Sequence, residues 1–138
     1  EYFLTEALDR MIRQGKIFKT ATVDEWLDCG TLPAWLETTG VIVEKEAATT
    51  LPTYEGSTIV PPVYIAEGVL IEGSTIGPHV SIEAGAQIKG STISNSIVRE
   101  QAQLSECVIE QSTVGAHAEL TNYTGVIHAG DHSIIESK

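Results

Sequence analysis

Basic residues and cysteine are scarce in this 138-residue chain, and their scarcity excludes several classes of binding site. Only 8 Lys and Arg stand against 19 Asp and Glu, which gives a formal net charge of -11 at pH 7. Such a charge repels phosphate backbones and anionic lipid, so we expect no nucleic-acid binding and no membrane binding. The two cysteines, Cys29 and Cys107, are too few for a disulfide framework and are not spaced as metal ligands. Two free thiols are therefore expected.

Long apolar runs and aromatic residues are also sparse. No run approaches the roughly 20 residues needed to cross a bilayer, and Glu1–Thr5 has no feature of a signal or transit peptide. We therefore expect a cytoplasmic location. Aromatic residues make up 6% of the chain, so a core must be built from aliphatic side chains. A hydrophobic content of 42% with 20% charge is ordinary for a folded protein.

Residues 1–48 follow a helical pattern. Apolar residues recur at i, i+4, i+7 and i+8, which predicts an amphipathic helix with Thr5 as a plausible N-cap and Gly15 as its stop. A short strand is expected over 16–21, and a second helix near Thr31. The apolar stripe of the first helix is Leu4, Leu8, Met11 and Ile12, and that of the second is Leu32, Trp35, Leu36, Ile42 and Val43.

From residue 51 onward, large aliphatic residues recur in steps of five or six, a period that fits neither a helix nor a flat strand. Three such steps predict one triangular coil of about 18 residues, with one aliphatic of each step stacked inward. An antiparallel meander would instead alternate with period 2. The aliphatic series is Ile59, Ile65, Ile71, Ile76, Ile82, Ile88, Ile93, Val98, Leu104, Ile109, Val114 and Leu120. The expected small inward residues are Val63, Val69, Val80, Ala86, Ala102 and Ala118, with Gly and Asn at the corners.

Several segments resemble the sugar-1-phosphate nucleotidyltransferases. The hexad Trp26–Thr31 (WLDCGT) resembles the end of the catalytic domain in glucose-1-phosphate thymidylyltransferases. The segment Glu1–Leu8 resembles their E-x-x-[IL]-T-[DE] motif, and Gly130–Ile135 the G-D-x-S close of long forms with a hexapeptide-repeat tail. The resemblance implies a mainly β chain: an α/β remnant of the catalytic domain over 1–48, then a left-handed parallel β-helix over 49–138.

The same resemblance implies specific roles. Asp28 matches a carboxylate that helps to hold Mg²⁺ against the nucleotide phosphates, and Thr5 and Trp26 match positions lining the sugar pocket. The full-length enzyme would make an NDP-sugar and pyrophosphate from an NTP and a sugar 1-phosphate, with neither sugar nor base specified. Without the resemblance, Asp28 would be interpreted as a solvated turn residue or as an acceptor at the helix start. Trp26 would be interpreted as a residue that packs in a core. No G-x-G phosphate loop occurs in the chain, so we expect these 138 residues alone to be inactive.

Two alternatives remain open. A hexapeptide-repeat acyltransferase would use a histidine as general base, but it would normally carry that histidine on a long loop, which is missing here. A non-catalytic oligomerisation module would need only the β-helix, whose flat faces and open ends associate unless covered. We therefore expect a homo-oligomer, and a helix over 31–47 covering the N-terminal coil end. The available histidines are His79, His117, His128 and His132, each expected at an exposed corner or edge.

Overall fold

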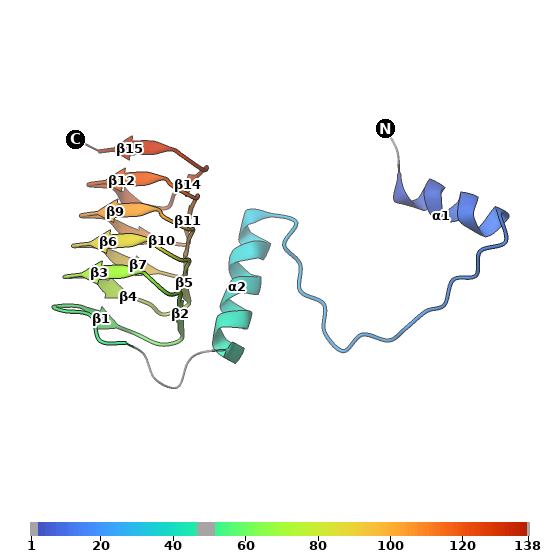
Figure 1. Ribbon diagram of the computed structural model, residues 1–138, viewed down its shortest axis with the longest axis horizontal. Helices are drawn as coiled ribbons and strands as arrows, with labels where there is room; N and C mark the ends of the chain where they lie inside the picture. The colour runs from blue at the N-terminus through green and yellow to red at the C-terminus, as the bar shows by residue number, and fades with distance from the viewer. Residues whose placement is uncertain (1–2, 47–51, 138) are drawn as a thin grey trace.

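The chain forms a parallel β-helix of about five coils, flanked by helical segments. The computed structural model describes residues 3–46 and 52–137. Within these residues two helices, α1 (Leu4–Arg13) and α2 (Leu32–Glu46), precede fifteen short strands (Figure 1). The predicted boundary between residues 48 and 49 lies outside the described residues. No helix in the described part of the chain is long and apolar enough to cross a bilayer.

The strands stack into three parallel sheets, here called faces A, B and C, with one strand per coil in each. Face A consists of β1 (Thr58–Ile59), β4 (Thr75–Ile76), β7 (Thr92–Ser94), β10 (Val108–Glu110) and β13 (Thr124–Gly125). Face B consists of β2 (Val63–Ile65), β5 (Val80–Ile82), β8 (Ile97–Val98), β11 (Thr113–Val114) and β14 (His128–Ala129). Face C consists of β3 (Leu70–Glu72), β6 (Gln87–Lys89), β9 (Gln103–Ser105), β12 (Glu119–Thr121) and β15 (Ile134–Glu136).

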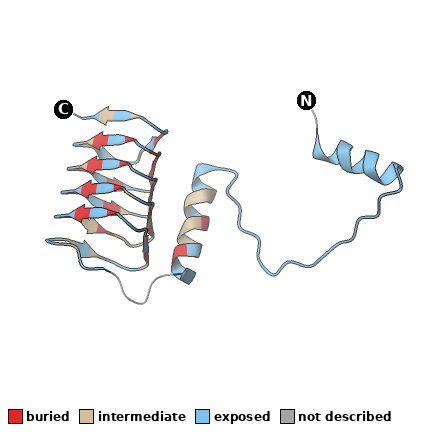
Figure 2. Cartoon of the chain, in the orientation of Figure 1, coloured by how far each residue is buried: buried red, intermediate tan, exposed pale blue. Residues whose placement is uncertain are grey.

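The interior is a set of aliphatic ladders, as the sequence predicted. Ile76 pairs with Ile93 on the next coil, and Ile93 pairs with Ile109 on the coil after that. The large aliphatic residues are buried except at the first coil, where Ile59 and Ile65 are half-buried (Figure 2). All six predicted small inward residues are buried as well. Each stacked aliphatic contributes about 1.5–3 kcal/mol, so the ladders form a core without aromatic residues.

The corners between faces turn through left-handed backbone conformations. Gly and Asn were predicted there, and Gly85, Asn95 and Asn122 do have positive φ angles. Other residue types also adopt this conformation, which the sequence did not predict: His79, Gln101, Glu106, Gln111, His117 and His132. Most L-residues enter this region at a cost. Stacking between coils holds five of these six residues in place, because every one but Gln111 donates its backbone N–H to the coil below. The amide of His117, for example, donates to the Glu100 carbonyl at 3.0 Å.

Buried serine hydroxyls connect successive coils and were not predicted. The Ser74 hydroxyl accepts a hydrogen bond from the Ser91 amide at 3.0 Å, and the Ser91 hydroxyl accepts one from the Cys107 amide at 3.0 Å. A second ladder runs from Ser96 to Ser112 and on to the Ile127 amide. Cys107 is buried and Cys29 exposed, and both are free thiols as expected. Each serine thus satisfies a buried amide at a corner, where no strand partner is available.

The segment before α2 differs in part from its prediction. α1 forms as predicted and Gly15 follows it with φ at 80°. The assignment of Thr5 as N-cap is wrong, because Phe3 occupies that position without a side-chain cap and Thr5 lies inside the helix. The strand expected over 16–21 is also wrong, since this stretch is irregular. All strands of the described residues belong to the three sheets of the β-helix, so none pairs with this stretch, and a single strand is not stable alone.

α2 lies along the side of the β-helix and does not cover its N-terminal end, which corrects that prediction. The helix begins after Thr31, as predicted, and packs against β2 and β5 on face B (Figure 1). Ile97 of face B lies outside the core cluster, yet it is only 2% exposed. Within α2 itself, Val43 is buried and Trp35 is half-buried. Apolar residues on the outer surface of face B thus supply the partner for α2.

Candidate functional site

The turn that carries Asp28 is built directly onto the start of α2. The Asp28 carboxylate accepts a hydrogen bond from the Gly30 amide through Oδ1 at 3.1 Å. The Thr31 hydroxyl accepts one from the Ala34 amide at 3.3 Å, which caps the first turn of α2. The WLDCGT hexad therefore forms a tight turn followed by a helix cap. Asp28 is exposed, so its carboxylate remains accessible to solvent and cations.

Two contacts from α2 hold this turn in place. The Thr38 hydroxyl donates to the Asp28 carbonyl oxygen at 2.6 Å, and Thr38 is only 7% exposed. About two helical turns further along α2, Lys45 forms an ion pair with Glu25. The ion pair is half-exposed and contributes little by itself. The buried hydroxyl is the stronger anchor, because its loss would leave a carbonyl without that donor.

The other two predicted site residues lie apart from this anchor. Thr5 is exposed on α1, and Trp26 is 82% exposed on the irregular segment. Within the described residues, no hydrogen bond or ion pair joins Thr5 or Trp26 to Asp28. α1 has no buried residue and stands away from the rest of the chain (Figure 1). The structure thus assembles the Asp28 turn but does not assemble a sugar pocket.

A metal centre is incomplete in this part of the chain. Over residues 3–46 and 52–137, no group of three or more His, Cys, Asp or Glu side chains is placed to hold a metal ion. Mg²⁺ commonly takes only one or two protein carboxylates and completes its shell with phosphate oxygens and water. The exposed carboxylate of Asp28 fits the role of one such ligand. A second protein ligand would have to come from elsewhere.

A groove of about 390 Å³ runs between α2 and the corner that joins faces A and B. His79 and His128 lie along it with the side chain of Glu37. His128 is already engaged, because its Nδ1 lies 3.1 Å from the Thr113 hydroxyl. His79 is half-buried, while the other three histidines are exposed, as predicted. The described coils run without a long inserted loop, so no histidine is presented in the way the acyltransferase alternative requires.

Arg99 forms a charged cluster that the sequence analysis missed. Its Nε lies 3.2 Å from Glu83 Oε2, one coil away, and its Nη2 lies 3.6 Å from Glu100 Oε2. The hydrogen bond and the charge of Glu83 raise the pKa of Arg99 above its ordinary value. Glu83 also accepts the Glu100 amide at 3.2 Å. Because both neighbours are carboxylates, this guanidinium is neutralised and does not offer a phosphate site. Its signal in the sequence is the 16-residue spacing of Glu83 and Arg99, which is one coil.

The chain matches no model of a known protein family, and no curated protein matches it significantly.

Proposed function

We propose that the chain is the C-terminal part of a sugar-1-phosphate nucleotidyltransferase. The complete enzyme makes an NDP-sugar and pyrophosphate from an NTP and a sugar 1-phosphate, and the β-helix, left-handed by the same resemblance, serves assembly or regulation. The observation that carries this proposal is the Asp28 turn, because the WLDCGT hexad forms a structured, anchored start to α2. A solvated surface turn would not need a buried hydroxyl to hold it.

Residues 3–30 support a larger unit in front of the β-helix. They expose Ile17 at 88% and Trp26 at 82%, and the apolar stripe of α1 has no partner within the described chain. Amphipathic helices are stable mainly because their apolar stripe packs against another element. We infer that the missing partner is the catalytic domain, with Thr5 and Trp26 lining its sugar pocket. The acyltransferase alternative does not account for this surface.

In this proposal Asp28 is one of the ligands for Mg²⁺. The metal, when bound, neutralises charge on the transferring phosphates and orients them. Asp28 contributes a single negative oxygen donor whose position is fixed by its own bond to Gly30 and by Thr38. The strongly acidic β-helix has nothing comparable to offer a triphosphate: over residues 51–138 only Lys89, Arg99 and Lys138 are basic. Nucleotide binding is therefore assigned to the preceding domain.

The direct test measures pyrophosphate release by the complete protein with an NTP, a sugar 1-phosphate and Mg²⁺. We expect Asp28→Asn to lower turnover by at least about 100-fold, because a metal ligand is worth several kcal/mol of charge stabilisation. Asp24→Asn, an equally conservative change at an exposed carboxylate four residues away, is the matched control and should leave turnover within about twofold.

Two outcomes would refute this proposal. One is a complete protein that releases no pyrophosphate with any common NTP and sugar 1-phosphate. The other is full activity of the Asp28→Asn variant. The 138 residues alone should release no pyrophosphate. Robust turnover by them would contradict the assignment of nucleotide binding to the preceding domain.

A further inference from the structure

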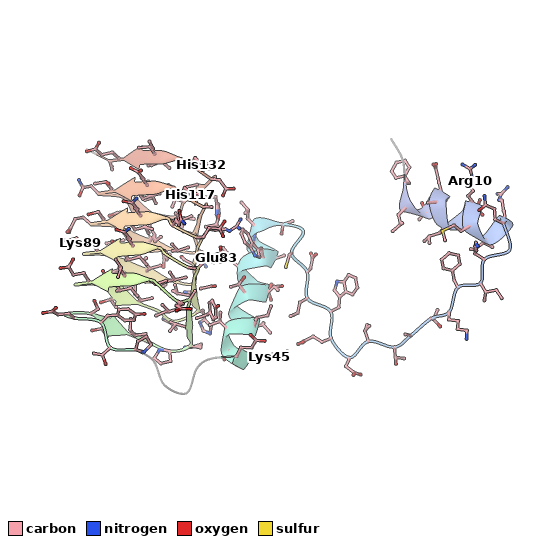
Figure 3. All side chains as sticks on the ribbon, in the orientation of Figure 1. Arg10, Lys45, Glu83, Lys89, His117 and His132 are labelled. Carbon is pink, nitrogen blue, oxygen red and sulfur yellow. The ribbon has the colours of Figure 1, made fainter. Side chains whose placement is uncertain are left out.

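Two histidines are stacked on neighbouring coils at the corner between faces B and C. The rings of His117 and His132 have centroids 4.9 Å apart and planes 4° from parallel. Figure 3 shows them one above the other near the C-terminal end of the β-helix. Both occupy the left-handed backbone region, with φ angles of 56° and 59°. Both side chains are exposed, and neither takes part in the Asp28 site.

The backbone holds this pair in register. The His117 amide donates to the Glu100 carbonyl at 3.0 Å, and the His132 amide donates to the Ala116 carbonyl at 2.8 Å. The Asp131 carboxylate accepts the Ala116 amide at 2.8 Å, which ties the same two coils together again. The two side chains therefore start from fixed, equivalent positions one coil apart. Little entropy remains to be lost when both bind one ligand.

We propose that His117 and His132 form a two-histidine site for a divalent transition metal of the zinc class. Neutral imidazole nitrogen is a preferred ligand for Zn²⁺, Ni²⁺ and Cu²⁺, and a poor one for Mg²⁺ and Ca²⁺. Two water molecules complete the tetrahedral shell. The net charge of -11 raises the local concentration of cations around the chain. Glu119 is two residues from His117 in the sequence, and Glu100 lies on the adjacent coil, where its carbonyl accepts the His117 amide.

Metal binding requires both rings to turn out of their parallel stack. In a tetrahedral site with Zn–N bonds of about 2.0–2.1 Å, the two nitrogens lie about 3.4 Å apart. The ring centroids are 4.9 Å apart, and because the rings are parallel, their in-plane nitrogen lone pairs do not yet converge on one point. Both rings are exposed, so rotation about their χ angles can turn one nitrogen of each ring toward a shared ion without moving the backbone. Asp131 is already committed to the Ala116 amide, so it is not counted as a third ligand.

Metal at this site would fasten the last coil to the one before it. His117 lies between β11 and β12, whereas His132 lies between β14 and β15, beyond which the described chain adds no further coil. The end coil of a solenoid has a neighbour on one side only and opens most easily. A ligand that binds the closed form but not the open one stabilises it in proportion to ligand concentration. Metal binding at this site would thus stabilise the last coil of the β-helix against local opening.

The test titrates the full chain with Zn²⁺ at pH 7.5 and follows the histidine ring resonances by NMR and heat release by calorimetry. We expect the signals of His117 and His132 to shift together with a stoichiometry of one. His117→Asn and His132→Asn should each weaken Zn²⁺ binding by at least about tenfold, because the remaining histidine then binds the ion without a second histidine held close to it. Asn suits the corner conformation, as Asn95 and Asn122 show, so the fold is kept.

His79→Asn is the matched control, since His79 has a φ angle of 55° at another corner and, among the residues that the structure describes, is not part of a histidine stack. It should leave Zn²⁺ affinity unchanged, and a large excess of Mg²⁺ should not compete. Zn²⁺ should also slow amide exchange in β14 and β15 of the parent chain but not of the His132→Asn variant. Equal affinity in all three variants, or shifts spread evenly over all four histidines, would overturn the proposal.

Discussion

The serine ladder inside the β-helix makes a quantitative prediction at Ser91. Its side chain is 1% exposed and makes two hydrogen bonds: it accepts the Cys107 amide at 3.0 Å and donates to the Lys89 carbonyl at 2.8 Å. Ser91→Ala removes both bonds while leaving the backbone free to keep its path. The Lys89 carbonyl retains a donor, because it also accepts the Glu106 amide at 2.9 Å. The Cys107 amide loses the partner described for it.

The expected loss of stability follows from that single amide. A buried backbone donor left without an acceptor costs about 1–3 kcal/mol, whereas the cavity left by one hydroxyl oxygen adds little. We therefore expect Ser91→Ala to lower the free energy of unfolding by about 1–3 kcal/mol. Ser94→Ala should change it by less than about 0.5 kcal/mol, because the Ser94 hydroxyl is half-buried and makes no hydrogen bond among those described.

Urea denaturation followed by far-ultraviolet circular dichroism measures both variants against the parent chain. The midpoint should fall for Ser91→Ala at an unchanged slope, which separates lost stability from a change in the surface exposed on unfolding. If the midpoints of the two variants coincide, the ladder hydroxyls do not stabilise the corners. The view that the serines replace strand partners for these amides would then be wrong.

Two further predictions concern the anchor and the assembly. Thr38→Val should raise the Mg²⁺ concentration for half-maximal activity of the proposed complete enzyme by about tenfold, and it should speed amide exchange over 24–30. Thr38→Ser keeps the hydroxyl and should restore both values. An unchanged Mg²⁺ requirement in Thr38→Val would show that the hydroxyl does not position Asp28. Sedimentation of the 138-residue chain should give a mass above its 14.8 kDa, and a monomer at every concentration tested would contradict the assembly role.

The period of the aliphatic residues was enough to predict the coil, because it reflects a constraint repeated at every step. Ile76, Ile93 and Ile109 must each fill the same volume in successive coils, so the sequence repeats where the structure repeats. The histidine stack has no such signature. His117 and His132 are 15 residues apart, and only the coil length of that region brings them together. The Ser91 ladder was missed because the sequence alone does not distinguish a buried serine from an exposed one.

The failures before residue 31 have a different physical cause. The strand expected over 16–21 was inferred from local alternation alone, but strands are stable only when paired, and no partner strand lies beside this stretch in the structure. The N-cap at Thr5 was wrong by two positions, which is within the usual uncertainty of helix ends. Local patterns predict a helix here because helix hydrogen bonds are local. They cannot predict a strand whose partner lies elsewhere.

The contacts of α2 argue against treating the β-helix as an independent appendage. Thr38 faces the Asp28 turn on one side of the helix, while Val43 is buried where α2 covers face B. A rigid helix that contacts both transmits a displacement of one to the other, provided that two arrangements of it exist. Because Val43 of α2 is only 4% exposed, a shift of the helix along face B would expose apolar surface and cost free energy. The position of Asp28 is therefore determined in part by the packing of α2 on the β-helix. If Asp28 is the metal ligand we propose, changes in the assembly of the β-helix can reach it through this helix.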